Sequence, residues 1–451
     1  MAQTPTSRIE DPSPALAARL VRPFAHFAQM GAAPGIVLLA CAVIALVWAN
    51  SAWSHVYHEL VHVEVGFAVG GFDITKPSEW WINDALMAVF FFVVGLEIKR
   101  EILIGELRSP RAAALPVIAA VGGMLAPGVI YACVNWGQPT VRGWGVPTAT
   151  DIAFALGVLA LLGKMVPAGL RVFLATLAIA DDIGALLVIA MFYTERLETG
   201  FLLYAGAALA AMVALNVSGV RRAWIYWIAG LFLWWFVYRS GVHATIAGVL
   251  GAMTIPSRSR VNRHAFAAFT RSALRTIEAE QDTPLHTSAS QQAAVQGIED
   301  ACQKVQTPMQ SLEHALVPWV SFLIVPVFAL ANAGVALTGG LAAAFTSPET
   351  LGIVLGLCVG KPLGITLFSL LAVKTGIGRL PSGVTPAMLH AAAWIAGIGF
   401  TMSLFIANLA FPGATHPSQL DHAKIGVLAG STVAGLIGLA LLWHATRRRG
   451  A

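Results

Sequence analysis

Long apolar runs alternate with short polar connections along almost the whole chain. Most of these runs approach the ~20 residues that an α-helix needs to cross the hydrocarbon core of a bilayer. The pattern therefore predicts an all-α polytopic membrane protein with about twelve transmembrane helices. The predicted spans, with edges good to a few residues, are 33–50, 82–104, 112–134, 140–161, 168–193, 200–217, 223–238, 241–256, 313–337, 349–373, 386–411 and 423–446.

The polar segments around these runs set the rest of the organisation. Residues 54–81 include HVEVGFAVGGFDI, whose partial alternation and glycines predict a small external β-hairpin. Residues 257–312 are rich in Gln, Ala and Thr, which predicts a long cytoplasmic loop with some helix. We expect a cytoplasmic N-terminal segment at 1–32, one membrane domain at 33–446, and a basic cytoplasmic tail at 447–451.

Composition agrees with a membrane protein. Hydrophobic residues make up 57% of the chain and charged residues 11%, whereas a soluble domain carries about 25% charged residues. The net charge of +5 could suggest nucleic-acid binding, but the basic residues are spread between the apolar runs, so we expect no nucleic-acid partner. The four cysteines show no CxxC spacing and are predicted to be free thiols.

Lysine and arginine are distributed unevenly between the two sides of this topology. Most of the 28 basic residues lie in the loops on one side. Cytoplasmic loops of membrane proteins carry the excess of Lys and Arg, so both termini are predicted to be cytoplasmic. The basic residues on the opposite side are Lys76, Arg142, Arg196, Arg239 and Lys424.

Two predicted spans, the fourth and the eleventh, contain residues that interrupt helices. Breaks there would free backbone groups, which is tolerated only where they line a cavity or are buried in protein. Discontinuous spans at matching places in two halves predict inverted-topology repeats of the kind found in transporters. The alternative for either span alone is that glycine and proline are common in transmembrane helices. The interrupting residues are Pro147, Thr148, Thr150 and Asp151 in one span, and Gly397, Gly399, Thr401 and Ser403 in the other.

Two adjacent aspartates, Asp181 and Asp182, lie in the middle of the span 168–193. A carboxylate at that depth costs at least about 2.5–3.5 kcal/mol, and charged residues within spans are functional by default. Neighbouring helix positions point about 100° apart, so one side chain can line a wet cavity while the other faces a buried cation. The alternative is a structural polar pair satisfied by neighbouring helices.

Two further ionisable residues, Lys361 and Asp151, are predicted at similar depth. A buried lysine either loses its proton or needs a carboxylate partner, which Asp181 or Asp182 can supply. Carboxylates with a hydroxyl or backbone oxygen nearby suit a small hard cation, and the same carboxylates bind protons. Such a site holds the cation or protons but not both. Alternating exposure of the site to the two sides of the membrane would exchange them, with no chemical step.

Several of these stretches resemble the signature sequences of the NhaA family of bacterial Na⁺/H⁺ antiporters. The matches extend from about Trp80 to Phe411. They comprise INDALMAVFFFVVGLEIKREI, VPTATDIAFALGVLALLG, LAIADDIGALLVIA, SGVHATIAGV, VGKPLGI and GIGFTMSLFIA. The resemblance implies the inverted-repeat architecture known for this family. It also implies electrogenic, pH-regulated exchange of cytoplasmic Na⁺ or Li⁺ for external H⁺ in the bacterial inner membrane. A homodimer is implied as well, with its contact through the external segment, and no resident cofactor.

The resemblance also assigns roles to individual residues at the predicted site. It implies that Asp182 binds sodium, that Asp181 pairs with Lys361, and that Thr150 and Asp151 lie at the helix break. Asp151 and Lys361 would then balance the half-helix dipole ends that meet there.

A second group of residues is implied to regulate the response to pH. The acidic residues Glu97, Glu101 and Glu313 match a pH-sensing region, and His243 matches a histidine that influences the pH response. The alternative for the acidic residues is ordinary snorkelling at the membrane interface. Val317 stands where the family usually has a second histidine, so regulation is the weaker inference.

Two other classes of function compete with antiport. A passive cation channel would have no need of a lysine able to neutralise an empty carboxylate site. An intramembrane protease is suggested by HExxH at 58–62, but that motif needs a helix, a third ligand and an open metal position. Here it lies in the external segment beside a strand-like run, with no evident third ligand. An aspartyl protease pairing Asp151 with Asp182 would leave Lys361 unexplained, so we predict that the protein is not an enzyme.

Overall fold

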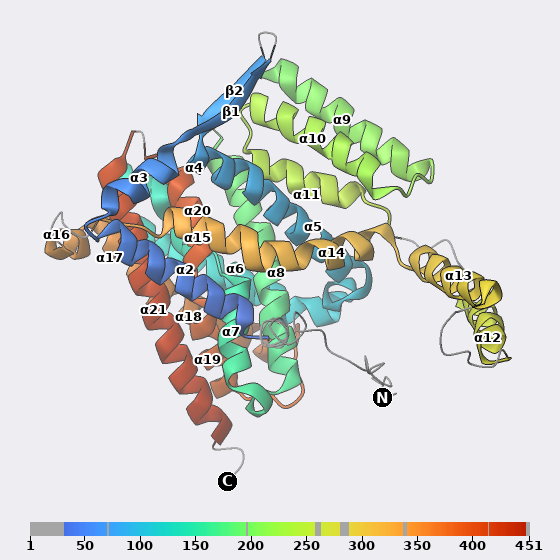
Figure 1. Ribbon diagram of the computed structural model, residues 1–451. Helices are drawn as coiled ribbons and strands as arrows, with labels where there is room; N and C mark the ends of the chain where they lie inside the picture. The colour runs from blue at the N-terminus through green and yellow to red at the C-terminus, as the bar shows by residue number, and fades with distance from the viewer. Residues whose placement is uncertain are drawn as a thin grey trace.

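The computed structural model describes residues 31–69, 72–194, 197–257, 263–279, 288–336, 341–413 and 415–447. Within these ranges the chain is mostly helical, and each predicted apolar run is occupied by a helix or by consecutive helices (Figure 1). Residues 1–30 and 448–451, which hold most of the predicted terminal segments, lie outside the described part.

Seven helical stretches in the described chain are long and apolar enough to cross a membrane, and up to ten are if each bent pair counts as one span. Four of the seven are single continuous α-helices: α6 (Pro110–Val134), α8 (Ala168–Phe192), α9 (Thr199–Val217) and α21 (Pro417–Arg447). The other three include a π-helical segment. They are α4–η1–α5 (Ser78–Trp80, Trp81–Leu86, Met87–Ile104), α14–η5–α15 (Pro308–Trp319, Val320–Ile324, Val325–Asn332) and α17–η7–α18 (Pro348–Leu355, Gly356–Gly360, Lys361–Lys374).

Three helix pairs are bent at short breaks. The 3-10 helix η3 (Pro139–Thr148) meets α7 (Ile152–Leu161) at 43°, and α19 (Pro386–Ala396) meets α20 (Phe400–Ala410) at 45°. Both bends fall in the runs that the sequence marks as interrupted. The third pair, α2 (Ala33–Ala49) and α3 (Ser54–His62), turns by 115°.

Two predicted spans, 223–238 and 241–256, each contain one helix that is shorter than the seven long stretches. The helix α10 covers Ala223–Arg239, and α11 covers only Ala244–Thr254. The helix α11 is shorter than the predicted run 241–256 because Gly241 adopts a left-handed backbone conformation (φ 82°) and the helix begins only after His243.

The strand-like run forms the predicted hairpin. The strands β1 (Glu64–Val69) and β2 (Phe72–Pro77) pair antiparallel, with Glu64 opposite Pro77. The backbone N–H of Ser78 donates to the carbonyl of Val63 (2.9 Å), so α4 starts directly at the base of the hairpin.

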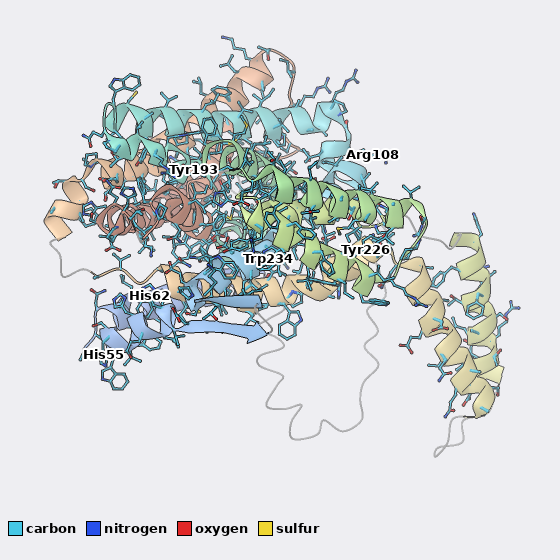
Figure 2. All side chains as sticks on the ribbon, turned by 90° about the horizontal axis from the view of Figure 1, so that it is seen from above. His55, His62, Arg108, Tyr193, Tyr226 and Trp234 are labelled. Carbon is cyan, nitrogen blue, oxygen red and sulfur yellow. The ribbon has the colours of Figure 1, made fainter. Side chains whose placement is uncertain are left out.

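The long polar segment between α11 and α14 is more helical than its composition suggests. It contains α12 (Arg263–Ala279) and α13 (Ala289–Val305), which pack against each other. In both Figure 1 and Figure 2 these two helices extend away from the rest of the helices.

Small residues allow the central helices to approach closely. A Cβ atom added at Gly364 of α18 would lie 2.1 Å from the carbonyl oxygen of Gly122 of α6, and one at Gly122 would lie 2.5 Å from the carbonyl of Gly364. Small residues at such crossings are typical of packed transmembrane helices. The close α6–α18 crossing brings Lys361, at the start of α18, into the interior beside α8.

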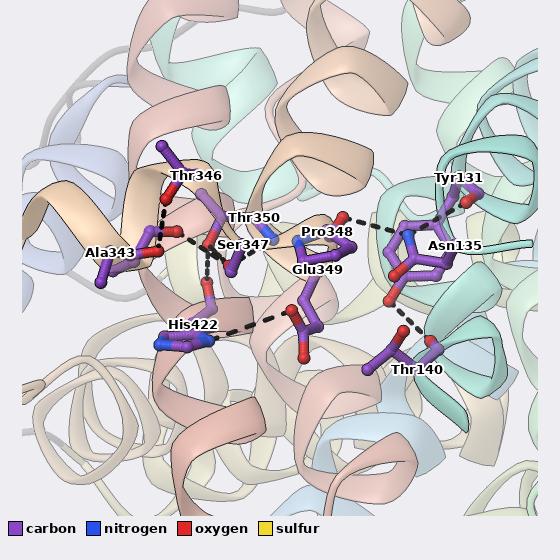
Figure 3. Close-up of polar contacts among 11 residues, drawn as sticks. Tyr131, Asn135, Thr140, Ala343, Thr346, Ser347, Pro348, Glu349, Thr350 and His422 are labelled. Carbon is purple, nitrogen blue, oxygen red and sulfur yellow. Dashed lines mark hydrogen bonds and ion pairs between the residues drawn. The ribbon is translucent and has the colours of Figure 1, made fainter. Parts of the chain in front are cut away.

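A polar cluster fixes the start of α17 (Figure 3). The Asn135 side chain donates to the carbonyl of Pro348 (3.0 Å), and the Thr350 hydroxyl donates to the carbonyl of His422 (2.7 Å). Nδ1 of His422 lies 3.9 Å from the Glu349 carboxylate. These contacts tie α17 to the end of α6 and to the first turns of α21.

Candidate ion-binding site

The two bent pairs cross at their breaks, and the crossing is held by hydrogen bonds between them. The backbone N–H of Asp151 donates to the carbonyl of Ile398 (2.8 Å), and the Thr150 hydroxyl donates to the carbonyl of Ala396 (2.9 Å). Gly397 and Gly399 lie in this break and Thr401 in the first turn of α20. A Cβ atom at Gly399 would lie 3.0 Å from the carbonyl of Ala149, so glycine permits the backbones to approach.

Asp151 joins the starts of two helices. It is the N-cap of α7, and its Oδ1 accepts from the backbone N–H of Phe154 (3.0 Å). Its Oδ2 accepts from the backbone N–H (3.2 Å) and the hydroxyl (2.5 Å) of Thr401. Helix N-termini favour negative charge because their first N–H groups have no partner within the helix. The buried Asp151 carboxylate is therefore stabilised by two helix ends at once.

Lys361 makes the complementary contact at the end of η3. Its ammonium donates to the carbonyl of Thr148, the last residue of η3 (2.7 Å), and to Oδ2 of Asp181 (2.8 Å). The Lys361 side chain is 0% exposed and that of Asp181 is 1% exposed. A buried cation needs such partners because its desolvation is costly.

Asp182 stands apart from this pair although it is adjacent in sequence. Its side chain is also buried. In the described part of the chain no side chain or backbone group hydrogen-bonds to its carboxylate, and Oδ1 of both Asp181 and Asp182 is buried without a partner. The helical offset between the two aspartates separates them as expected, since only Asp181 contacts Lys361.

The charges of this cluster do not balance by themselves. Three buried carboxylates, Asp151, Asp181 and Asp182, face one ammonium, that of Lys361. Two helix ends compensate Asp151, and Lys361 compensates Asp181, so Asp182 is left with a net negative charge when ionised. A buried unpaired charge is costly. The site therefore favours binding either a small cation with oxygen ligands or a proton.

The sequence predicted a wet cavity beside one of the two aspartates. In this conformation neither carboxylate is open to solvent, because Asp181 and Asp182 are each 1% exposed. A cavity of about 890 Å³ lies between the first turns of α6 and α8 and the end of α18. Its wall includes Thr176, five residues before Asp181 on α8, together with Phe173 and Leu115. The predicted topology places this cavity on the cytoplasmic side.

Comparison with known proteins identifies the family. The model of the family described as "Na+/H+ antiporter 1" matches residues 25–442. The chain belongs to this family.

Proteins named Na(+)/H(+) antiporter NhaA are similar over nearly their whole length. The relative from Oleidesulfovibrio alaskensis is 51% identical over 426 residues (94% of each chain). The one from Koribacter versatilis is 48% identical over 425 residues (94% of this chain, 92% of the relative). The one from Escherichia coli O1:K1 is 45% identical over 419 residues (92% and 97%). The resemblance seen in the sequence is thereby confirmed.

Two of the three acidic residues matched to the pH-sensing region of this antiporter family, Glu97 and Glu313, contact one arginine. Arg100 contacts Glu313 (2.5 Å) and Glu97 (3.5 Å). The neighbouring Glu101 accepts a hydrogen bond from the backbone N–H of Glu106 (2.8 Å). The Arg100–Glu313 ion pair thus links α5 to α14, while the regulatory role of these residues stays a prediction.

His243 belongs to a different part of the protein. It is the N-cap residue of α11, and its Nε2 lies 2.7 Å from the carbonyl oxygen of Tyr193, which follows α8. The contact connects α11 to the end of the helix that carries the two aspartates. Its influence on the pH response also remains a prediction.

The HExxH motif at 58–62 lies on the helix α3, directly before the strand-like run that forms β1. Its second histidine, His62, is labelled in Figure 2, together with His55 near the start of the same helix. Nδ1 of His62 lies 3.6 Å from the Glu79 carboxylate. Among the residues that the structure describes, no three His, Cys, Asp or Glu side chains are grouped so that they could hold a metal ion. The helix alone therefore does not make a metal centre.

Some groups at the crossing were not singled out in the sequence. The Ser431 hydroxyl accepts from the backbone N–H groups of Gly399 (3.2 Å) and Phe400 (3.1 Å), and so supports the start of α20. A serine in an apolar run gives no sequence signal for this contact. By contrast, Asn332 and Asn408 are single amides within apolar runs, and that was a signal that they need partners.

Proposed function

We propose that this protein is a secondary active antiporter that exchanges cytoplasmic Na⁺, and also Li⁺, for external H⁺. Family membership and the names of the relatives support Na⁺ and H⁺ as the transported ions. The observation that carries the proposal is the buried Asp182 carboxylate without a partner, beside the Asp181–Lys361 ion pair.

In this proposal Asp182 is the first ligand of the cation. Na⁺ prefers oxygen ligands, which Asp182 and the unpartnered Oδ1 of Asp181 can supply. Protons on the same carboxylates would remove the charge that attracts Na⁺. Exchange follows from this competition when the site is exposed to each side in turn.

Lys361 and Asp151 have supporting roles in the same scheme. Lys361 neutralises Asp181 while no cation is bound, and it also holds the end of η3 through the Thr148 carbonyl. Asp151 and the hydroxyls of Thr150 and Thr401 keep the two breaks together. All of these groups bind or orient, so the proposal includes no covalent step and no resident cofactor.

We further propose the full topology: twelve spans, with η3–α7 and α19–α20 as discontinuous fourth and eleventh spans in inverted repeats. The two bends of similar size at matching places support this arrangement. The excess of Lys and Arg on one side supports cytoplasmic termini. It also supports a single membrane domain at 33–446 whose polar loop 257–312 is cytoplasmic, with the termini 1–32 and 447–451 on the same side.

The remaining family properties are proposals for this chain as well. These are electrogenic exchange, regulation by pH through the cluster around Arg100, a homodimer that uses the β1–β2 hairpin, and residence in the bacterial inner membrane. The ion pairs between Arg100 and Glu97 and Glu313 support the regulatory part, because protonation of either acid would change them.

The decisive experiment measures whether Na⁺ transport is coupled to proton transport in the opposite direction. Purified protein in liposomes with an imposed pH gradient should take up ²²Na⁺ and dissipate the gradient in proportion, and Li⁺ should compete. Na⁺ uptake without proton counterflow, with the membrane potential clamped, would instead indicate a passive channel. No Na⁺-dependent flux in a monodisperse, folded preparation would refute the proposal.

A further inference from the structure

Three elements that meet beyond the crossing form two successive layers of side chains. These elements are η1–α5, α15 and α20, and they contact one another directly or through their neighbours (Figure 1). In the proposed topology α5 enters from the external side, whereas α15 and α20 end there. Residues early in η1–α5 and late in α15 and α20 therefore lie nearest the external surface.

The deeper layer is aromatic. The ring centroid of Phe405 lies 5.4 Å from that of Phe91 and 6.2 Å from that of Phe328. All three side chains are buried. Each element contributes one ring: Phe91 from α5, Phe328 from α15 and Phe405 from α20. The Phe328 and Phe405 rings pack edge to face and the Phe91 and Phe405 rings are tilted, so the buried rings leave little room for water between them.

The outer layer consists of amides from the same three elements. Nδ2 of Asn408 donates to Oδ1 of Asn332 (2.6 Å), and Nδ2 of Asn332 donates to Oδ1 of Asn83 (2.8 Å). Asn332 also donates to the carbonyl of Phe328 in the aromatic layer (2.9 Å). This bond lies within α15 and orients the Asn332 side chain one turn beyond Phe328.

Both layers are in register with the ion site through α20. Thr401, which binds Asp151, is followed on the same face of α20 by Phe405 after four residues and by Asn408 after seven. At 1.5 Å per residue these positions lie about 6 Å and about 10 Å from Thr401 along the helix. The helix α20, which carries Thr401, therefore contacts α5 and α15 through Phe405 and contacts α15 through Asn408, one and two turns beyond Thr401.

We propose that Asn83, Asn332 and Asn408 are positioning residues that hold α20 against η1 and α15 and so keep the external path to the ion site closed over the aromatic layer. The inference rests on the proposed antiport function, because only a transporter must open this path and close it again. Amides suit a closure that must be released. Their hydrogen bonds hold one arrangement and can be exchanged for bonds to water when the layer parts.

The geometry also indicates which contact breaks first. Asn83 and Asn332 share two hydrogen bonds, whereas Asn408 is held to Asn332 by one, and its own Oδ1 is buried without a partner. An unpartnered buried acceptor is unfavourable and gains a partner when water enters. Opening at Asn408, with α20 moving away from the other two elements, is therefore the least costly separation.

Accessibility from outside tests the proposal. Leu404 is fully buried and lies one turn from both Thr401 and Asn408 on α20. In a chain without its four native cysteines, Leu404→Cys serves as the reporter. Intact cells are treated with a membrane-impermeant thiol reagent, and the labelling rate is measured with and without Asn408→Ala. Asn83→Ala provides a second variant if Asn408→Ala does not fold.

Each lost hydrogen bond should raise the open population, and with it the labelling rate, about fivefold. The matched control is Asn216→Ala, because Asn216 donates to the carbonyl of Thr254 in another helix (2.7 Å), at the ends of α9 and α11 that the proposed topology places on the cytoplasmic side. Its labelling rate should remain at the background value.

Two outcomes overturn the proposal: unchanged labelling in both layer variants, or equally fast labelling in Asn216→Ala, which would indicate general loosening. Labelling requires no transported ion, whereas antiport is measured by flux of the unmodified chain. A failure of the closure and a failure of the proposed function are therefore distinguishable.

Discussion

The ammonium nitrogen of Lys361 lies 2.8 Å from Oδ2 of Asp181, and both side chains are almost completely removed from solvent. This ion pair connects α18 to α8, and the second hydrogen bond of Lys361, to the Thr148 carbonyl, adds η3. One side chain therefore links three elements that are far apart in the sequence. Its removal should affect stability as well as transport.

Replacement of Lys361 by Ala should markedly destabilise the protein. The Asp181 carboxylate would remain buried without its cation, and breaking one side of a buried ion pair typically costs about 3–5 kcal/mol. The melting temperature of the purified protein measures this loss. Lys374→Ala, at the other end of α18 and outside the crossing, should melt like the unmodified protein.

A second substitution distinguishes the lost ion pair from a lost hydrocarbon chain. Asp181→Asn added to Lys361→Ala removes the uncompensated charge, so the double variant should melt at a higher temperature than Lys361→Ala alone. Equal melting temperatures would show that the pair contributes little and that packing of the lysine stem dominates.

Replacement of Asp182 by Asn should abolish exchange while leaving the fold intact. The described structure contains no hydrogen bond to this carboxylate, so the neutral amide removes the charge for Na⁺ without removing a structural contact. Flux in proteoliposomes and the melting temperature are measured together. The predicted result is no Na⁺-dependent proton movement with an unchanged or slightly higher melting temperature.

Glu59→Gln is the control for that experiment. Glu59 is the acid of the HExxH motif on α3, and it is exposed and lies outside the crossing. Unchanged flux is expected, whereas loss of function in Glu59→Gln would revive a metal-dependent activity. Near-normal exchange in Asp182→Asn would remove the central assignment of the ion ligand.

Much of the helical architecture could be predicted from the sequence because apolar periodicity and length decide it locally. The helices in the apolar runs and the hairpin at 64–77 appear where predicted, and two bends between helices fall within the two runs marked as interrupted. The start of α11 was placed too early because the apolar pattern does not reveal the left-handed backbone conformation of Gly241. The helix α3 was not predicted because its nine residues were grouped with the strand-like run that follows them.

At the site the sequence located the charged residues but not all of their partners. Aspartates and a lysine in apolar runs are conspicuous, and the 100° offset between Asp181 and Asp182 predicted that they face different partners. The contacts of Ser431 and the Thr148 carbonyl depend on how distant helices cross. No local pattern encodes such contacts, and they required the three-dimensional structure.

The close α6–α18 crossing should not tolerate even a methyl group. Gly364→Ala would place its Cβ 2.1 Å from the carbonyl oxygen of Gly122, and overpacking of this kind costs about 1–3 kcal/mol. The melting temperature should fall. Gly206→Ala in α9 is the matched control, because nothing lies within 4 Å of its added Cβ. Similar melting of the two variants would mean that α6 and α18 separate easily.

Replacement of Thr401 by Val should weaken Na⁺ binding, whereas Thr401→Ser should preserve it. The Thr401 hydroxyl donates to Oδ2 of Asp151 (2.5 Å), and a hydrogen bond to a charged group contributes about 1.5–3 kcal/mol. Valine keeps the shape but removes the hydroxyl donor, and Asp151 then holds the start of α20 only through the backbone N–H of Thr401 (3.2 Å). The half-saturating Na⁺ concentration for exchange should rise in Thr401→Val, because the crossing is loosened, and change little in Thr401→Ser. Equal values in both variants would show that the backbone contact alone positions α20 at the crossing.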